Sequence, residues 1–317
     1  MAAFFCSMYY LYSMQFYFRW SFFIGFLFAH MLVWSQEIIT YDRSDFDLKG
    51  PVKSCFVFTK YGQEQYLFNR SGQLVQAATV FGENDSETTY YKYEKEKLVE
   101  RRVENYVNGA LDKTTSMANF YSYDSLPQLK IKEKIIGYDR NFVAQFNYRY
   151  DSIGQLTRLV RTNTQGRFIT LISHEWDSLR TQKSTAYWQD SLPLKQVDSI
   201  FFKAGGTLIQ LNIKEFDNGI PSSMEQRMFN KKCLEMELHN YIYIEKDSLY
   251  VPKKASSVRT KYNSNNHPIE QIFERGVVRQ TKKILYQLDG SPFKNWIKKI
   301  TTPDNSYTTR KIVYFEE

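Results

Sequence analysis

The sequence has 317 residues, a formal net charge of +8, and 17% aromatic and 24% charged residues. A chain of this length can bury a sizeable core, and its Tyr- and Phe-rich composition favours sheets whose strands bury one face. The charge pattern argues against a nucleic-acid partner, because Lys and Arg alternate with Glu and Asp along most of the chain, which is typical of a solvated sheet surface.

Residues 1–35 are predicted to be a secretory signal peptide that forms a hydrophobic helix. Residues 2–34 are overwhelmingly apolar, and Arg19 is their only fixed charge. If translation starts at Met14, residues 14–20 form the charged n-region, residues 21–33 form the apolar h-region, and the mature chain starts at Gln36. An uncleaved membrane helix is the alternative, and this segment would then be the part that contacts a membrane. Cys6 lies too early for a lipid anchor.

The mature chain is predicted to consist of a polar N-terminal arm, residues 36–50, and one repeat domain, residues 51–317. The domain is organised around residues 146–156. Phe146, Tyr148 and Tyr150 alternate with polar residues, which is the pattern of a strand with one apolar face. Asp151 can accept hydrogen bonds from backbone amides just downstream, Gly154 can take a positive φ, and Leu156 returns to the packed face.

Degenerate copies of this strand-and-turn motif recur along the chain. The best copy has Phe68, Asn69, Gly72 and Leu74 in the positions of Tyr150, Asp151, Gly154 and Leu156. The weaker copies are Tyr93-Glu94 with Leu98, Tyr123-Asp124 with Leu129, Trp176-Asp177, Phe202 with Gly206 and Leu208, Phe216-Asp217-Asn218-Gly219, Tyr262-Asn263 with Pro268, and Leu288-Asp289-Gly290.

The spacing of the copies predicts the fold. The aromatic anchors follow one another at steps of roughly 25 to 30 residues, which is the length of two strands and two turns. Residues 216–258 break this spacing and are expected to hold a longer hairpin or an insertion. We therefore predict an all-β, single-domain antiparallel meander of hairpins, arranged as a single curved sheet or an open half-shell.

The motif of an aromatic residue, Asp or Asn, two variable residues, Gly, one variable residue and Leu resembles the YD repeat of the RHS family. Residues 150–156 and 68–74 match it best, and the chain is most similar to small exported bacterial proteins with such arrays. The resemblance implies a β-hairpin array at the cell envelope, in a periplasmic, outer-surface or extracellular location. In the large members the repeats form a shell around a toxin, whereas this array looks too short to close, and no toxin domain is expected after Tyr314.

Few residues suggest chemistry. The mature histidines His174, His239 and His267 lack HxH or HExxH spacing, so we predict neither a metal site nor another cofactor. His174 and Glu175 are neighbours on a strand and would point to opposite faces. No catalytic residue is assigned. Cys55 and Cys233 are expected to be unpaired thiols, because residues so far apart in a linear array would not meet.

The aromatic residues carry one candidate binding site. Trp176, Tyr187, Trp188 and Trp296 could form a flat platform that stacks sugar rings or a peptide. Packing within the sheet is the alternative, although the adjacent Tyr187 and Trp188 cannot both face inward.

Three hypotheses about function follow. The leading one is a non-enzymatic exported β-repeat protein that binds an envelope glycan or protein, or that has a structural role. The second is an outer-membrane β-barrel, which needs a lipid-compatible face on its strands. The third is a sheet-based envelope hydrolase, which needs convergent acids or a histidine in a pocket.

Overall fold

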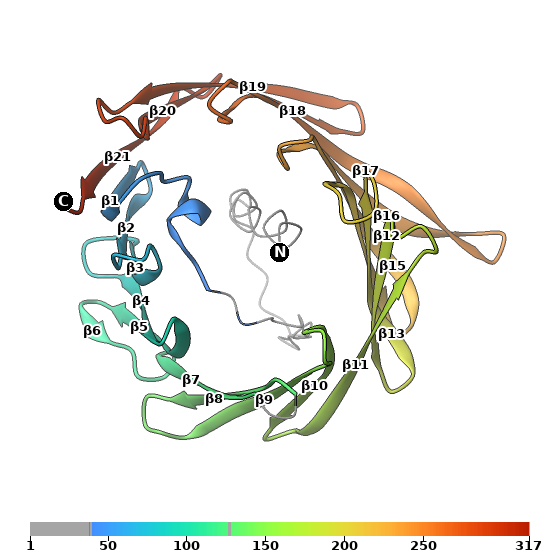
Figure 1. Ribbon diagram of the computed structural model, residues 1–317. Coiled ribbons are helices and arrows are strands. Elements are labelled where there is room, and N and C mark those ends of the chain that lie inside the picture. Colours follow the sequence, from blue (N-terminus) through green and yellow to red (C-terminus); the bar gives the residue numbers. More distant parts are fainter. Residues whose placement is uncertain (1–37, 39, 126–127, 317) are drawn as a thin grey trace.

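The computed structural model describes residues 38, 40–125 and 128–316 (Figure 1). The predicted signal peptide and its helix lie outside this part of the chain. The described residues form one 3-10 helix and 21 strands. The elements are η1 (Arg43–Phe46), β1 (Val52–Thr59), β2 (Gly62–Phe68), β3 (Leu74–Val80), β4 (Ser86–Glu94), β5 (Lys97–Val107), β6 (Ala110–Leu111), β7 (Met117–Asp124), β8 (Lys130–Gly137), β9 (Phe142–Tyr150), β10 (Leu156–Asn163), β11 (Gly166–Trp176), β12 (Gln182–Gln189), β13 (Leu192–Phe201), β14 (Leu208–Asp217), β15 (Ile220–Phe229), β16 (Glu235–Lys246), β17 (Leu249–Tyr262), β18 (Pro268–Arg275), β19 (Val278–Leu288), β20 (Trp296–Thr302) and β21 (Ser306–Tyr314).

The sheet is the predicted all-β antiparallel meander, but it is closed. β1 pairs with β21 from Val52 opposite Tyr314 to Phe58 opposite Thr309, so the first and last strands join. The short β6 pairs with β5 alone, and the other 20 strands form a continuous barrel wall (Figure 1). The expectation of an open half-shell is therefore wrong. A barrel can close with as few as about eight strands, so this array is long enough.

Regularly placed β-bulges help the sheet to curl. In most repeats the register of strand pairing shifts by one residue directly before the aromatic or leucine anchor. One strand therefore has an extra residue at this point, which is a β-bulge. A bulge bends its strand and increases the local twist, so its repetition around the ring favours closure. The anchors with this shift are Phe68, Tyr93, Phe201, Phe229, Tyr262 and Leu288.

The turn after β9 has the chemistry expected from its sequence. The backbone amides of Ile153 and Gln155 donate to Asp151 Oδ1 at 3.0 and 2.8 Å, and Gly154 has a φ of +80°. Asn230 and Asn263 accept the same pair of amide hydrogen bonds in their own turns. These turns all lie at one end of the barrel, because each follows a strand of the same direction in the antiparallel meander.

Gly154→Val is expected to lower the free energy of unfolding by about 1 kcal/mol or more, because valine is strained at positive φ. No atom within 4 Å would meet the added Cβ, so the cost is conformational. Urea denaturation measures it. Gly82→Val is the matched control, since Gly82 also has open space and its φ is not positive. Equal stabilities of the two variants would contradict the turn assignment.

Two of the predicted repeat copies are shifted in the structure. Phe201 ends β13 as the anchor, whereas Phe202 lies in the turn and is 68% exposed. Residues 216–219 form a plain hairpin at the opposite end, with Asn218 and Gly219 both at positive φ. The repeat turn of that unit begins instead at Phe229 and Asn230. The irregular segment also contains the long hairpin of β16 and β17, the longest strands of the barrel.

The apolar face of the sheet points into the barrel. Phe46 of η1 packs against a buried cluster on β1 to β3 that includes Tyr66 and Phe68, and Ile38 packs against a second cluster that includes Tyr148. The N-terminal segment that carries these residues runs inside the ring (Figure 1). Cys55 is buried in the first cluster, Cys233 is half-buried, and both are free thiols.

Candidate functional site

The N-terminal arm lies in the lumen and is hydrogen-bonded to the wall at both of its ends. At its start, the amide of Leu74 donates to the carbonyl of Tyr41 at 2.9 Å. At its end, the side chain of Asn295 donates to the carbonyl of Lys49 and accepts from the amide of Lys49, both at 2.8 Å. The arm, residues 40–50, is therefore an internal plug and not an exposed extension.

Asp47 is the centre of a polar cluster between the arm and the wall. The indole Nε1 of Trp296 donates to Asp47 Oδ2 at 2.9 Å, and His267 Nε2 lies 3.7 Å from the same oxygen. The guanidinium of Arg310 stacks 3.5 Å from the ring centroid of Trp296 and donates to the carbonyl of Phe46. We call Asp47, His267, Trp296 and Arg310 the Asp47 cluster. Its contacts to Asp47 and Phe46 join the arm to β20, β21 and the turn before β18, and the stacking of Arg310 on Trp296 joins β21 to β20.

The Asp47 cluster makes stability depend on pH through His267. This histidine is 2% exposed, and burial lowers the pKa of its imidazole. Asp47 opposes that shift, whereas Lys49 and Arg310 add to it. Since the pKa in the folded state is depressed below its ordinary value of about 6.5, stability is fully present above that pH and is lost as the pH falls.

Between pH 7 and pH 5, the His267→Gln variant is therefore expected to lose less of its free energy of unfolding than the wild type does. Asp45 acts in the opposite direction, because burial raises its carboxyl pKa to about 6 and its contribution is lost as the pH rises through that value. Both proteins contain Asp45, so the difference between their urea midpoints isolates His267. Parallel midpoint curves for the wild type and the variant would contradict a buried neutral imidazole.

A buried carboxylate lies on the lumenal side of β8. Glu133, 4% exposed, accepts from Asn119 Nδ2 at 2.6 Å and from the hydroxyls of Tyr121 and Tyr148 at 3.0 and 2.7 Å. Both carboxylate oxygens are thus engaged by β7 and β9. A charged group buried in this way is stabilised by its donors, and it ties three strands together.

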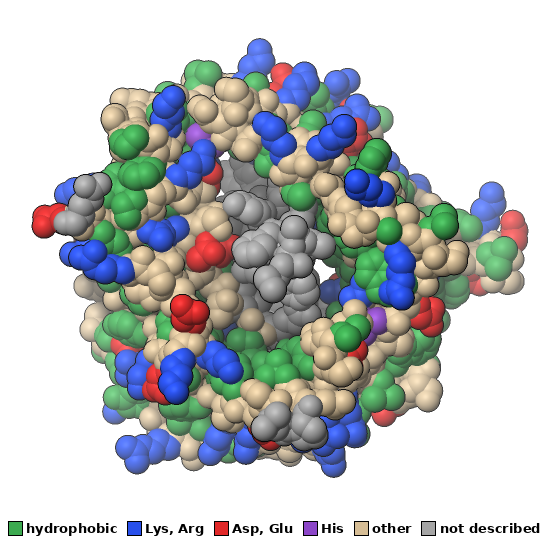
Figure 2. Space-filling model, in the orientation of Figure 1, with side chains coloured by type: hydrophobic (Ala, Val, Ile, Leu, Met, Phe, Trp, Pro, Cys, Tyr) green, Lys and Arg blue, Asp and Glu red, His purple; other side chains and the backbone are tan. Residues whose placement is uncertain are grey.

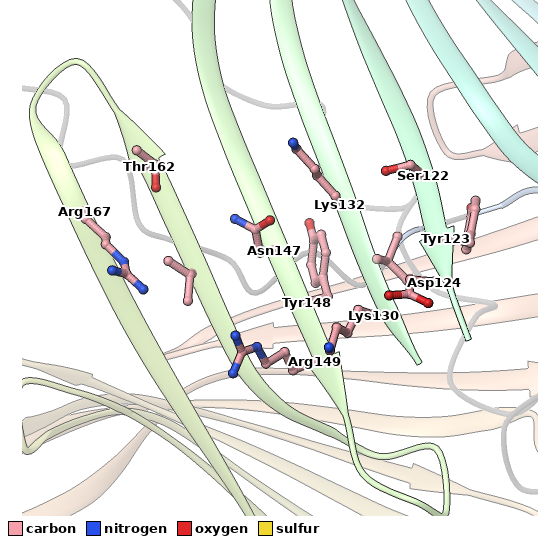
Figure 3. Close-up of a pocket in the computed structure, with 12 residues that line it drawn as sticks. Ser122, Tyr123, Asp124, Lys130, Lys132, Asn147, Tyr148, Arg149, Thr162 and Arg167 are labelled. Carbon is pink, nitrogen blue, oxygen red and sulfur yellow. The ribbon is translucent and has the colours of Figure 1, made fainter. Parts of the chain in front are cut away.

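The outer wall carries a pocket across β7 to β11. Its volume is about 630 Å³, and Figure 3 shows the side chains around it. Since Ile131, Tyr148 and Leu159 belong to the lumenal cluster, their neighbours in the strands point outward. Val160 forms part of the floor and is buried although it faces outward. We call this pocket the outer groove.

Basic side chains dominate the outer groove. Its lining includes Lys130, Lys132, Arg149 and Arg167, with Asp124 as the acid in the lining. The alternation of Lys130, Lys132 and Lys134 in the sequence was a signal for one basic face, but the register that brings arginines beside it is visible only in the structure. Sequence reasoning missed this site.

The proposed aromatic platform is not assembled. Trp296 faces the lumen, 5% exposed, in the Asp47 cluster, and Tyr187 packs against the lumenal cluster around Tyr148. Trp188 pairs with Leu171 on the outward face, and Trp176 stacks on Phe201 with ring centroids 5.8 Å apart. The four rings therefore lie in separate places and do not form one surface.

His174 has a structural place. Its ring nitrogens lie 3.1 Å from the Thr185 hydroxyl and 2.8 Å from the Leu156 carbonyl oxygen. Glu175 alternates with it and faces outward, paired with Ser184. Within the described ranges, no group of three or more His, Cys, Asp or Glu side chains could hold a metal ion. No helix among the described residues is long and apolar enough to cross a membrane.

Comparisons with known proteins leave the family open. No family model and no curated protein matches the chain. A porin-like protein from Bacteroides uniformis is similar over 65% of this chain and 95% of its own, with 9% identity and a TM-score of 0.35. The TcdB2-TccC3 structure has 10% identity over 76% of this chain and 20% of its own, with a TM-score of 0.20. A protein with unknown function from Bacteroides fragilis has 16% identity over 54% of this chain and 91% of its own, with a TM-score of 0.15. At such TM-scores these likenesses carry no argument about function.

Proposed function

We propose that the protein is an exported, non-enzymatic β-barrel of the bacterial cell envelope with a binding or structural role. The observation that carries the proposal is the closed wall, with the chain's own arm hydrogen-bonded to its lumenal side. The outer surface of the barrel is then a place where a partner can bind. The hydrophobic leader and the YD-like turns support export and an envelope location.

Closure of the sheet favours the hypothesis of an outer-membrane β-barrel over that of an exported protein with an open sheet. A barrel without an unpaired edge satisfies all its backbone groups internally, as a membrane-spanning sheet must. Because β1 pairs with β21, this wall meets that requirement. Insertion into the outer membrane is therefore the second candidate for the barrel's location.

The outward face carries large hydrophobic side chains such as Leu171 and Trp188, but its ion pairs favour a wall surrounded by water. Arg102 lies between Glu100 and Glu104 on β5, and Lys261 pairs with Glu270 across β17 and β18 at 2.6 Å. Figure 2 looks at one end of the barrel and shows Lys and Arg side chains around its rim. In lipid, each Lys or Arg near the bilayer midplane would cost about 2–4 kcal/mol. We therefore place the wall in the periplasm or at the cell surface first.

Fractionation of the expressing bacterium, with the mature N-terminus determined by mass spectrometry, tests both points. A chain starting at Gln36 in a soluble periplasmic or extracellular fraction is the expected result. A mature chain that remains in the outer membrane and needs detergent for extraction would establish the second candidate. An intact leader in a cytoplasmic fraction would overturn export.

A further inference from the structure

The outer groove holds an excess of positive charge that the fold does not need. In register across β8, β9 and β10, Lys130 pairs with Arg149, and Arg149 pairs with Arg158. Like charges directly opposite each other on a sheet are destabilising. No ion pair among the described residues involves these three cations or Lys132, Lys134 and Arg167. Asp124 on β7 lies opposite Lys130 and is the acid in the lining, so Lys130, Lys132, Arg149 and Arg167 leave the groove with a positive charge that points to an anionic ligand.

The cations are concentrated toward the two ends of the groove. Lys130, Arg149 and Arg158 form one row, and Lys134 on β8 and Arg167 on β11 belong to a row four residues further along, about 13 Å away by ordinary strand rise. Lys132 and Asn147 lie in the row between these two groups, and Thr162 lies beside Arg167 in the second row. Amide and hydroxyl groups match the hydroxyls of a sugar, and Lys and Arg match phosphate oxygens.

We propose that the outer groove binds an envelope saccharide that carries a phosphate at each end. The cation groups hold the phosphates, Asn147 hydrogen-bonds the sugar rings between them, and Lys132 and Thr162 line the groove beside the saccharide. The volume of about 630 Å³ is within the usual range for sites of small ligands and holds about two rings. The proposal deepens the proposed function, since an exported barrel would meet such saccharides in the envelope.

Calorimetric titration of the mature protein tests the groove. The probe is a glucosamine disaccharide with phosphates at positions 1 and 4′, and the same disaccharide without phosphates is its comparison. Lys130→Gln/Lys132→Gln is expected to weaken binding of the probe at least about tenfold, because each charge-assisted hydrogen bond contributes about 1.5 kcal/mol or more. The disaccharide without phosphates is expected to bind at least about tenfold more weakly than the probe, on the same ground.

The control variant is Lys283→Gln/Lys311→Gln, which removes the same charge from exposed outward positions on β19 and β21. It should bind the probe as the wild type does. Equal binding by the groove variant would overturn the proposal, and so would inorganic phosphate binding as tightly as the probe. Tighter binding of a single-stranded DNA oligomer would replace the saccharide with nucleic acid. The titration uses purified protein and does not depend on where the cell places it. An absence of saccharide binding can therefore be distinguished from an absence of export.

Discussion

Trp296→Ala is expected to lower the free energy of unfolding by about 3–5 kcal/mol, as truncation of a large buried aromatic does. The indole is 5% exposed and donates to Asp47, and its ring supports the guanidinium of Arg310. Alanine would leave a cavity beside Tyr286 and remove the hydrogen-bond donor to the carboxylate of Asp47. Urea denaturation followed by far-UV circular dichroism measures the change.

Trp188→Ala is the matched control, because this indole lies on the outward face and is 39% exposed. We expect it to cost about 1 kcal/mol or less, which is typical of surface substitutions. Similar losses for both tryptophans would contradict the lumenal position of Trp296 and its role in holding the arm.

Phe46→Ala/Leu48→Ala is expected to cost about 4 kcal/mol or more and to release the arm, since both side chains fill the first lumenal cluster. The ring of Phe46 lies 4.3 Å from that of Tyr66 between centroids, and Leu48 is 4% exposed. Urea denaturation measures the loss. Limited proteolysis with mass spectrometry shows whether residues 40–50 become accessible.

Ile153→Ala/Leu249→Ala removes similar side chains from exposed positions, 75% and 68% exposed, and should change stability little. An arm that is cleaved at the same rate in the wild type and in the Phe46→Ala/Leu48→Ala variant would show that it is not packed in the lumen. The plug would then have no role in stabilising the barrel.

Local features of the fold could be predicted because they depend on neighbours in sequence. The alternation of Phe146, Tyr148 and Tyr150 identifies the inward face of β9, and the structure buries Tyr148 at 1% exposure. The turn at Asp151 follows from a short acceptor side chain and a glycine, which act within five residues. Such patterns need no knowledge of distant partners.

Features that depend on distant pairing could not be predicted in this way. The contact between β1 and β21 joins the two ends of the chain, and no local pattern encodes it. The polar composition of the arm gave no sign that it lies in the lumen. Asp47 can lie there because the indole of Trp296, on a strand distant in sequence, donates a hydrogen bond to it. Residues 216–219 are predicted as a repeat copy because an aromatic residue and Asp precede a glycine there. The actual copy begins at Phe229 and has Cys233 at the positive-φ position, where the motif has glycine.

The outer groove shows the same limit. Lys130 and Lys132 alternate within one strand and are visible in the sequence, but Arg149 joins them only through the register of β8 with β9. The aromatic platform failed for the opposite reason. Trp188 and Trp296 are alike in type, yet one faces outward and the other faces the lumen, and only the pairing of their strands decides between the two faces.

The closed wall is the central claim, and a disulfide across its seam tests it most directly. Ser54 and Val313 are paired on β1 and β21. Residues directly opposite in antiparallel strands have Cα atoms about 4.5–5.5 Å apart, within reach of a disulfide. In Ser54→Cys/Val313→Cys, mild oxidation should link the two cysteines within one chain, detected as a cross-linked peptide by mass spectrometry, while Phe58→Cys/Val313→Cys, out of register, should not. No cross-link in the first variant under conditions that leave the protein folded would contradict closure and return the sheet to an open meander.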